Sequence, residues 1–551
     1  MPEVLYSGCS YPNFVIKNKI KKMLHGSCRK PHFDSDDGLI QVDKILEKTR
    51  EDIDNRPSML MMSGDQIYAD DVAGPMLSAI HQVIKRLGLH DESWQGASLN
   101  NSEELFSSDL CYYQRDLLLP MCSRSSAYDN TIFDYSKSVY KKLFTTSKKP
   151  IFTTVHAKNH LVTLSEVLAM YILVWSPSMW RLVDLNETSS STPNILPVYK
   201  DIYHKEKDII KSFSAGLPHV ARALAHLPVY MIFDDHDVTD DWNLTRGWEE
   251  TAYGHPFSKR ILGNALIGYW LCQGWGNCPK KFTELNDKVK EYFKAEHIEK
   301  QDQLIDELLL WDQWHYNLET KPKVIVLDTR TQRWRSESNA NKPSGLMDWE
   351  ALSLLQQSLI DQPDIILVSP APIYGVKMIE TIQRFFTFLG FPLMVDAENW
   401  MAHSGTANVM LNIFRHKKTP PHFIILSGDV HYSFFYEITH RFRRNKSRIF
   451  QITASGIKNQ FPTKLLNILE SLNRYLYSVY SPLNWFTKRR HMKVCVRKPQ
   501  RNKNKKVSNK TLVNRSAIGL ITITHDELVV KAELLTVDNE SIFFHSLKKK
   551  R

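Results

Sequence analysis

The feature that most constrains this 551-residue chain is a set of six short apolar runs, each ending in residues able to do chemistry. The runs are residues 4–6, 59–62, 229–233, 324–327, 365–368 and 423–426. Such runs are typical of buried strands, and functional residues of α/β sheets lie just past the carboxyl ends of strands. We therefore expect six strand ends to converge on one site in an α/β fold.

The segments between these runs carry helical patterns. Apolar spacing predicts helices over residues 205–227 and over Trp349–Leu359, although Gly216 and Pro218 interrupt the first. Residues 75–200 are long and mixed, and we interpret them as a largely helical insertion. Residues 516–551 alternate like a C-terminal β-hairpin.

Composition narrows the class of protein. Hydrophobic residues are 42% and charged residues 24%, which is ordinary for a globular chain and excludes a wholly disordered one. The seven Cys are few and odd in number, so a disulfide framework is not expected. The sequence has neither a recognisable signal peptide nor an apolar run of membrane-spanning length. We expect a cytoplasmic protein, with peripheral membrane contact as an option.

The net charge of +11 is concentrated in one segment. Residues 471–525 contain 13 Lys or Arg and no Asp or Glu. We interpret residues 471–515 as a basic, flexible insert, centred on an exposed loop over residues 488–510. A solvated loop, an anionic membrane contact and a nucleic-acid contact all fit this composition. For the apolar stretch just before it, residues 465–485, we favour a core helix over a helix on a membrane surface.

One strand end offers a carboxylate and a phenol. Gly64-Asp65-Gln66-Ile67-Tyr68 follows the second apolar run. A carboxylate can bridge two metal ions, whereas a phenolate ligand needs a strongly acidic metal such as Fe³⁺, because the free phenol has a pKa of about 10. The motif alone also fits an Asp turn followed by a packed Tyr.

A second strand end is acidic. Residues 234–241 read Asp-Asp-His-Asp-Val-Thr-Asp-Asp, which places five carboxylates and one His within eight residues. Such a cluster repels itself without a cation or a set of hydrogen-bond donors. Hard oxygen ligands suit Ca²⁺, Mg²⁺, Mn²⁺ or Fe³⁺. A solvated acidic turn with helix-capping Asp is the structural alternative.

The first and last strand ends add three more candidate residues. Asp429 and His431 follow the last run, and they face the same side if the segment stays extended. Cys9 follows the first run, where a thiolate would be a soft ligand that favours iron over calcium. A buried small hydrophobe is the other interpretation of Cys9. Each motif alone is weak evidence for a metal site, whereas the occurrence of all of them in this order is much more specific.

The order Gly-Cys-Ser, Gly-Asp-x-x-Tyr, Asp-Asp-His-Asp, Leu-Asp-Thr-Arg, Gly-Asp-Val-His resembles the PhoD-like alkaline phosphatase family, a branch of the calcineurin-like metallophosphoesterases. The motifs run from Cys9 to His431. The resemblance implies one catalytic domain over residues 1–551, built as a four-layer αββα sandwich with helices outside two stacked sheets. It also implies a centre of Fe³⁺ with Ca²⁺, for which Mn²⁺, Mg²⁺ or Zn²⁺ could substitute.

The resemblance also implies roles for individual residues. The iron ligands would be Cys9, Asp65 and Tyr68, with Asp65 bridging. The remaining metal would be held by Asp235, Asp429 and His431. His236 stands where the superfamily places its catalytic His, Asp235 replaces the usual Asn, and Asp234 would orient His236 from behind the ligands.

These expectations lead to a functional hypothesis. The chain would hydrolyse phosphomonoesters or phosphodiesters by in-line attack of a metal-held oxygen, with His236 protonating the leaving oxygen. Arg330 and Arg333 would add positive potential near the phosphate or form structural ion pairs. A purple-acid-type phosphatase fits less well, because Cys9 and Asp429 depart from its motifs. The alternative function is a catalytically inactive fold that binds anionic lipid or nucleic acid through residues 471–515.

Overall fold

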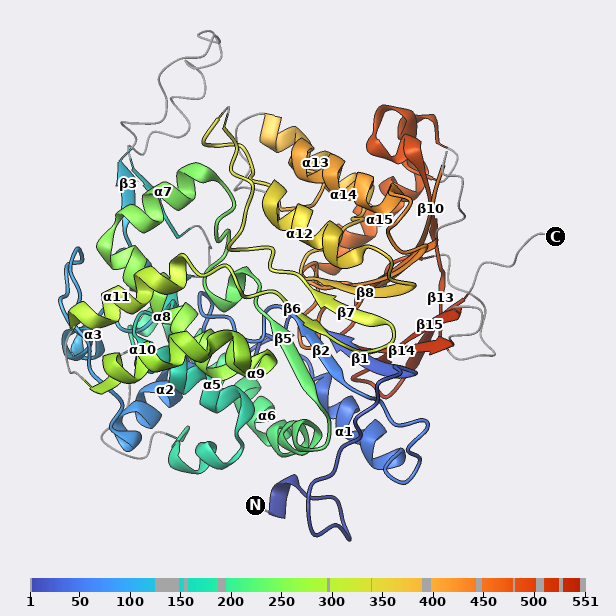
Figure 1. The fold of residues 1–551 in the computed structure, drawn as a ribbon. Helices are drawn as coiled ribbons and strands as arrows, with labels where there is room; N and C mark the ends of the chain where they lie inside the picture. The colour runs from blue at the N-terminus through green and yellow to red at the C-terminus, as the bar shows by residue number, and fades with distance from the viewer. Residues whose placement is uncertain are drawn as a thin grey trace.

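The computed structural model describes residues 2–123, 148–152, 157–186, 195–294, 298–337, 339–388, 398–441, 448–478, 481–501, 510–524 and 529–545. These residues form a mixed α/β protein with two seven-stranded sheets, a short hairpin and many helices (Figure 1). The hairpin pairs β3 (Met121–Ser123) with β4 (Lys148–Pro150).

The first sheet joins the two ends of the chain. β1, β2 and β5 run parallel, and the C-terminal strands extend the sheet antiparallel from β1. Its strands, in spatial order, are β13 (Pro499–Arg501), β16 (Ser541–Phe544), β15 (Val529–Thr536), β14 (Ala517–Thr524), β1 (Lys22–Gly26), β2 (Leu60–Ser63) and β5 (Val229–Ile232). β14 and β15 pair as an antiparallel hairpin, and β16 adds a third strand to it.

The second sheet comes from the C-terminal half. β7, β8, β9 and β11 run parallel, and β6, β10 and β12 are antiparallel to their neighbours. Its strands, in spatial order, are β12 (Met492–Val496), β10 (Phe434–His440), β11 (Arg448–Thr453), β9 (His422–Ser427), β8 (Asp364–Ser369), β7 (Lys323–Val326) and β6 (Tyr316–Leu318).

The two sheets pack against each other through one buried apolar cluster. Met61 of β2, Ile366 of β8 and Ile424 of β9 belong to this cluster. Their sequence neighbours on either side point to the opposite faces and join separate clusters with helices. Because both faces of each central strand are buried, the strands appear in the sequence as continuous apolar runs rather than alternating ones.

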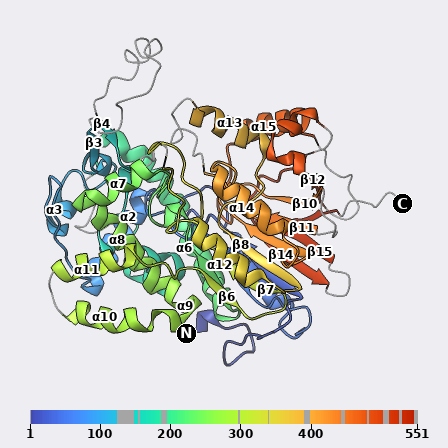
Figure 2. The same cartoon turned by 45° about the horizontal axis from the view of Figure 1, so that its top comes forward.

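Helices cover the outer faces of the sheets (Figures 1 and 2). α1 (Leu39–Lys48) and α6 (Lys200–Ala225) share a buried cluster with the first sheet. α12 (Trp349–Leu359), α14 (Ser404–Arg415) and α15 (Thr463–Leu476) share one with the second sheet. α13 (Lys377–Phe388) lies beside α15.

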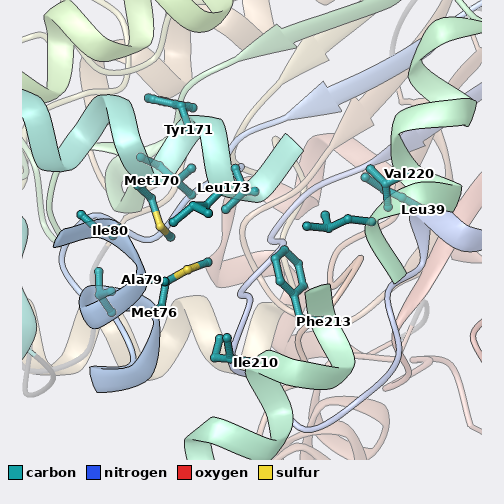
Figure 3. Close-up of a cluster of buried hydrophobic side chains, with 14 of the residues drawn as sticks. Leu39, Met76, Ala79, Ile80, Met170, Tyr171, Leu173, Ile210, Phe213 and Val220 are labelled. Carbon is teal, nitrogen blue, oxygen red and sulfur yellow. The ribbon is translucent and has the colours of Figure 1, made fainter. Parts of the chain in front are cut away.

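A helical region lies to one side of the sheets (Figure 1). It contains α2 (Gly74–Leu87), α3 (Ser102–Ser107), α5 (Leu164–Trp175), α7 (Arg246–Gly254), α8 (Pro256–Tyr269), α9 (Trp275–Asn277), α10 (Thr283–Lys294) and α11 (Ile298–Leu309). Figure 3 shows Met76 and Ile80 of α2, Met170 and Leu173 of α5 and Phe213 of α6 facing one another. This cluster joins α2 and α5 to α6, which packs on the first sheet.

Two sequence expectations fail in the fold. Residues 4–6 do not form a strand; Pro2–Val4 is a 3-10 helix, and the first ligand-bearing strand is β1. The prediction of an exposed loop over residues 488–510 is wrong for residues 492–501. These residues supply edge strand β12 of one sheet and edge strand β13 of the other. Residues 502–509 lie outside the described residues. Among the helices that the structure describes, none combines the length and the apolarity required to cross a bilayer.

Candidate metal centre

Ligand-type side chains gather where strands of the two sheets end. Asp65 follows β2 and Asp235 follows β5 in the first sheet, whereas Asp429 and His431 follow β9 in the second. Gly428 allows the two sheets to meet here, because a Cβ at that position would lie 2.3 Å from Oγ of Ser27, just past β1. The candidate site therefore lies at the seam between the sheets.

Two groups of potential metal ligands share Asp65. In one group, ligand atoms of Cys28, Asp65 and His431 all lie within 4.8 Å of one another. In the other, ligand atoms of Asp65, Asp235 and His236 meet the same limit. One carboxylate common to two ligand groups is the arrangement needed to bridge a pair of cations.

The backbone is strained at four of these positions. The φ angles are 61° at Cys28, 55° at Asp65, 68° at Asp429 and 59° at His431. Non-glycine residues seldom adopt the left-handed region, and such strain clusters at functional sites when the surroundings hold it in place. Asp429 and His431 therefore do not lie on an extended strand, as the i, i+2 spacing suggested. His431 joins the group of Cys28 and Asp65 through this left-handed geometry, whereas Asp429 belongs to neither of the two ligand groups.

Tyr68 closes one side of the site. Its hydroxyl lies 3.5 Å from Oδ2 of Asp65 and 3.3 Å from Nε2 of His431, and it accepts a hydrogen bond from Nδ2 of Asn459 at 3.0 Å. Burial and the neighbouring Asp65 charge raise the pKa of Tyr68 well above its usual value. A phenolate here therefore requires a cation at the hydroxyl.

His236 is oriented by Asp70. Nδ1 of His236 donates to the Asp70 carboxylate, with a distance of 2.9 Å to Oδ2. Burial disfavours the imidazolium, but the charges of Asp70 and Asp235 and this hydrogen bond raise the pKa of His236 well above 6.5. The ring also stacks on Tyr68 at a centroid distance of 4.6 Å. These contacts fix the ring and favour its protonated form, with Nε2 not engaged by Asp70.

Asp234 does not have the role expected of it. Its carboxylate accepts a hydrogen bond from Nε of Arg330 at 2.5 Å, whereas the carboxylate that orients His236 is that of Asp70. Arg330 also lies 3.2 Å from Asp235 and 2.5 Å from Glu398, which in turn pairs with Arg333. All of these groups are buried. The two arginines therefore form ion pairs, and Arg330 places its charge beside one candidate ligand, Asp235.

Asp237 organises the loop that carries Asp65. Its carboxylate accepts hydrogen bonds from the backbone N–H groups of Asp65, Gln66 and Ile67 at 2.9 to 3.1 Å, and it caps its own turn. Gly64 permits this loop to pass tightly over Asp234, since a Cβ there would lie 2.5 Å from the Asp234 Cβ. The acidic motif thus combines candidate ligands with carboxylates that support the backbone.

The carboxylates of the site carry opposite pKa shifts. Burial, followed by the charges of Asp234 and Asp235, raises the pKa of Asp429 well above its usual value. Burial and nearby acids also raise the pKa of Asp65, despite the counteracting charge of His236. Burial opposes ionisation of Asp235 too, but Arg330 and His236 hold its pKa below 3.8. Ionisation of Asp65 and Asp429 is therefore disfavoured without a cation, and a bound cation would favour their ionised forms.

The donor set fits metal ions. Among the described residues, neither Oδ1 of Asp65 nor Oδ2 of Asp234 has a hydrogen-bond partner, although both atoms are buried. A buried carboxylate oxygen left without a partner is costly, and metal coordination removes that cost. Burial lowers the pKa of His431 to about 3, so its imidazole is neutral and has a lone pair for a metal.

Cys9 lies away from this centre. Its Sγ accepts a weak contact from Nη1 of Arg50 at 3.7 Å, and its side chain packs against the cluster on the outer side of the first sheet. The thiol in the centre belongs to Cys28, 3.3 Å from the hydroxyls of Ser27 and Ser455. The expectation for Cys9 is corrected, because the strand that ends at the site is β1 and not residues 4–6.

The chain has few detectable relatives. No family model matches it, and no curated protein matches it in sequence. A solved structure described as "Structure of PhoD" superposes with a TM-score of 0.37 and 10% sequence identity, covering 97% of this chain and 74% of that one. This likeness is distant, and we base no functional inference on it.

The sequence analysis missed three residues that touch the centre. Cys28 follows Gly26-Ser27, but β1 reads Lys-Met-Leu-His-Gly, and its charged and polar positions hide the strand. Asp70 lies only five residues after Asp65, in a run of two aspartates that offered a signal. Asn459, which donates to Tyr68, follows no apolar run that marks it.

Proposed function

We propose that this protein is a metal-dependent phosphoesterase of the PhoD-like type, acting on phosphomonoesters or phosphodiesters. The observation that carries the proposal is the shared position of Asp65 in two groups of side chains, one with the thiol of Cys28 and the imidazole of His431, and one with the carboxylate of Asp235 next to His236. The packing of helices, sheet, sheet and helices supports a four-layer αββα arrangement for the same chain.

The donor chemistry supports two different cations. Cys28 and Tyr68 next to Asp65 suit Fe³⁺, which binds thiolate and phenolate well, and His431 completes that side. Asp235 and Asp429 offer carboxylate oxygens that suit Ca²⁺, with Mn²⁺, Mg²⁺ or Zn²⁺ as substitutes. Metal ions of this kind neutralise phosphoryl oxygens and activate the attacking water.

His236 is the residue we assign to proton transfer. A leaving alkoxide needs a proton, and a general acid must hold one at the working pH. The Asp70 hydrogen bond fixes the ring and keeps it protonated, with Nε2 available to the leaving oxygen. Arg330 neutralises Asp234 and Asp235, so these carboxylates do not repel an anionic substrate as strongly.

Two substitutions test the proposal. We expect Asp65→Asn to reduce metal content and turnover together, and His236→Ala to reduce turnover by about 10²- to 10⁴-fold while metal content is retained. Metal content is measured on the purified protein, and turnover with a phosphomonoester and a phosphodiester chromogen. His204→Ala, which removes an exposed histidine on α6, is the matched control and should match wild type.

The outcomes separate the alternatives. Wild-type turnover in both site variants would refute the proposal. A protein that binds no metal and shows no turnover after reconstitution with iron and calcium would also refute it. Loss of metal in His236→Ala would instead make His236 a ligand.

A further inference from the structure

Helix α15 has two apolar faces. Leu466 and Leu469 are buried beneath the helix. A second stripe lies at spacings of three, four and three residues, which places its members on one side of a helix. Its side chains are between 39% and 84% exposed and are Leu465, Ile468, Leu472 and Tyr475. The core-helix interpretation of this stretch accounts for the first face only.

Further exposed aromatic side chains lie at the end of α15. In the 3-10 helix Pro482–Phe486, Trp485 is 70% exposed and Phe486 is 85% exposed. Asn484, just before them, is buried and donates to the backbone oxygen of Ser478 at 2.7 Å, which fixes the turn. An ordered turn that directs two large aromatic rings into solvent differs from an isolated exposed side chain.

Helix α13 extends this surface. It is joined to α15 by a hydrogen bond from the Met378 N–H to Asn473, and by one from Thr381 to the hydroxyl of Tyr477. Phe385 of α13 is 58% exposed. The two helices lie side by side in both views (Figures 1 and 2). We call the exposed apolar residues of α13, α15 and Pro482–Phe486 the apolar face.

The apolar face is bordered by positive charge. Lys464 precedes its stripe and Lys488, Arg489 and Arg490 follow Phe486, whereas residues 471–525 contain no acid. The acids of α13 and α15 are buried and already bound: Glu470 accepts hydrogen bonds from Thr511, and Glu380 pairs with Lys377. On α13, α15 and the described residues 481–501, the border therefore presents cations without exposed carboxylates.

A mainly cationic pocket opens beside the apolar face. It has a volume of about 160 Å³, and its lining includes Lys377, Arg384 and Lys488. One carboxylate also lines it, Glu380, which pairs with Lys377 at 2.7 Å, so Arg384 and Lys488 supply the excess positive charge. Burial and the charges of Arg384 and Lys377 lower the pKa of Lys488, which shows that the three cations are close. Lys488 is two residues from Phe486, so the pocket lies next to the exposed aromatic turn.

We propose that the apolar face docks onto a bilayer of anionic phospholipid, with a headgroup phosphate in the pocket of Lys377, Arg384 and Lys488. Apolar and aromatic side chains beside a cationic border match the two layers of a membrane surface, the acyl boundary and the charged headgroups. The Trp485–Phe486 turn enters the interface, and the pocket then lies at headgroup depth.

The aliphatic stripe favours lipid over other partners. Leu465, Ile468 and Leu472 have no role against a phosphate backbone, whereas single-stranded nucleic acids are bound by aromatic platforms along a cationic groove. A second copy of this chain would bring two cationic borders together. Anionic lipid accepts both the apolar stripe and the charge.

Vesicle co-sedimentation tests the proposal with the full chain. We expect binding to phosphatidylcholine vesicles with about 30 mol% phosphatidylserine, and weaker binding to pure phosphatidylcholine or at high salt. Trp485→Ser with Phe486→Ser should abolish sedimentation with vesicles. Arg384→Ala with Lys488→Ala should weaken binding to anionic vesicles by roughly fivefold per charge.

Matched controls keep the test specific. Lys85→Ala with Arg86→Ala removes two exposed charges from α2, and Leu310→Ser with Trp349→Ser removes two exposed apolar side chains elsewhere. Both should bind vesicles like wild type. Asp65→Asn should also bind, so the result is independent of the proposed hydrolase function.

Three results would overturn the proposal. One is the absence of binding to anionic vesicles, or binding that is reduced neither by the double substitution of Trp485 and Phe486 nor by that of Arg384 and Lys488. Another is tighter binding to a DNA or RNA oligonucleotide than to anionic vesicles, lost in the Arg384 and Lys488 variant. The third is a dimer in sedimentation velocity that the Trp485 and Phe486 variant converts to monomer.

Discussion

At the scale of single residues, two thiols 19 positions apart in the sequence differ in whether they lie in the candidate metal centre. Cys28 lies with Asp65 and His431, whereas Cys9 lies beside Arg50 outside the centre. We expect Cys28→Ser to lower iron occupancy at least about tenfold, because even outer-shell substitutions have effects of that size. We expect Cys9→Ser to match wild type. Iron content and visible absorbance measure both, and equal loss in the two variants would contradict the assignment.

Asp70 provides a second residue-scale prediction. Asp70→Asn removes the charge that raises the pKa of His236, so the imidazole loses its proton at lower pH. A general acid is active only while protonated, and the alkaline limb of the kcat profile should therefore move to lower pH. We expect turnover to fall about 10- to 100-fold with metal content unchanged. An unshifted pH profile would assign Asp70 a purely structural role.

Residues of the candidate site could be predicted from the sequence where a motif followed a clear apolar strand, and not elsewhere. Asp65, Tyr68, Asp235, His236 and His431 were all found from the sequence and lie together. Cys28 was not found, because buried His25 interrupts the apolar run of β1. His25 is tolerated there because it is neutral, with burial lowering its pKa to about 3, and Ser63 lies 2.9 Å from its Nε2.

At the scale of elements, local pattern succeeded for strands buried on both faces. The runs at residues 59–62, 229–233, 324–327, 365–368 and 423–426 correspond to β2, β5, β7, β8 and β9, and the helix Trp349–Leu359 has the expected bounds. Gly216 and Pro218 do not break α6, which continues from Lys200 to Ala225. Packing of α6 against α1 and the first sheet overrides the local cost of both residues.

The contact between α2 and α5 depends on one buried ionic network. Glu166 of α5 pairs with Arg115 at 2.7 Å and with His81 of α2 at 2.8 Å, and it accepts the backbone N–H of Val162. Burial opposes its ionisation, but Arg115 and these hydrogen bonds hold the pKa of Glu166 below its ordinary value of 4.5. Breaking such a pair leaves a buried charge without a partner.

We therefore expect Glu166→Gln to lower the free energy of unfolding by about 3–5 kcal/mol near neutral pH. A depressed folded-state pKa gives stability that is present above the unfolded value and lost as pH falls. The difference between variant and wild type should therefore shrink below about pH 4.5. Urea unfolding at several pH values measures it. Glu103→Gln on exposed α3 is the control, and an equal loss there would contradict the network's role.

At the scale of the whole molecule, the centre joins the two sheets. Cys28 and Asp65 follow strands of the first sheet, and Asp429 and His431 follow β9 of the second. The sequence separates these groups by more than 360 residues, so local pattern cannot specify their distance. Their meeting depends on the sheet-to-sheet cluster and on the absence of a side chain at Gly428, both of which are long-range properties.

This placement predicts that cations stabilise the fold as a whole. Without a cation, burial and the neighbouring acids oppose ionisation of Asp65 and Asp429, and a bound cation offsets that cost. A ligand that binds only the folded state stabilises it by about 2.7 kcal/mol at 100 times its Kd. We expect iron and calcium to raise the Tm of the chelator-treated wild type, and chelation to reverse the rise.

Asp65→Asn tests whether the stabilisation comes from this seam. The substitution removes the carboxylate shared by both ligand groups, so added metal should raise its Tm much less than that of wild type. Its metal-free Tm should be equal to or above that of metal-free wild type, because a neutral amide replaces a buried carboxyl whose ionisation is opposed by burial and nearby acids. If added metal raised the Tm of Asp65→Asn as much as that of wild type, the stabilising cations would bind elsewhere in the chain. The candidate site would then not contribute to the stability of the two-sheet core.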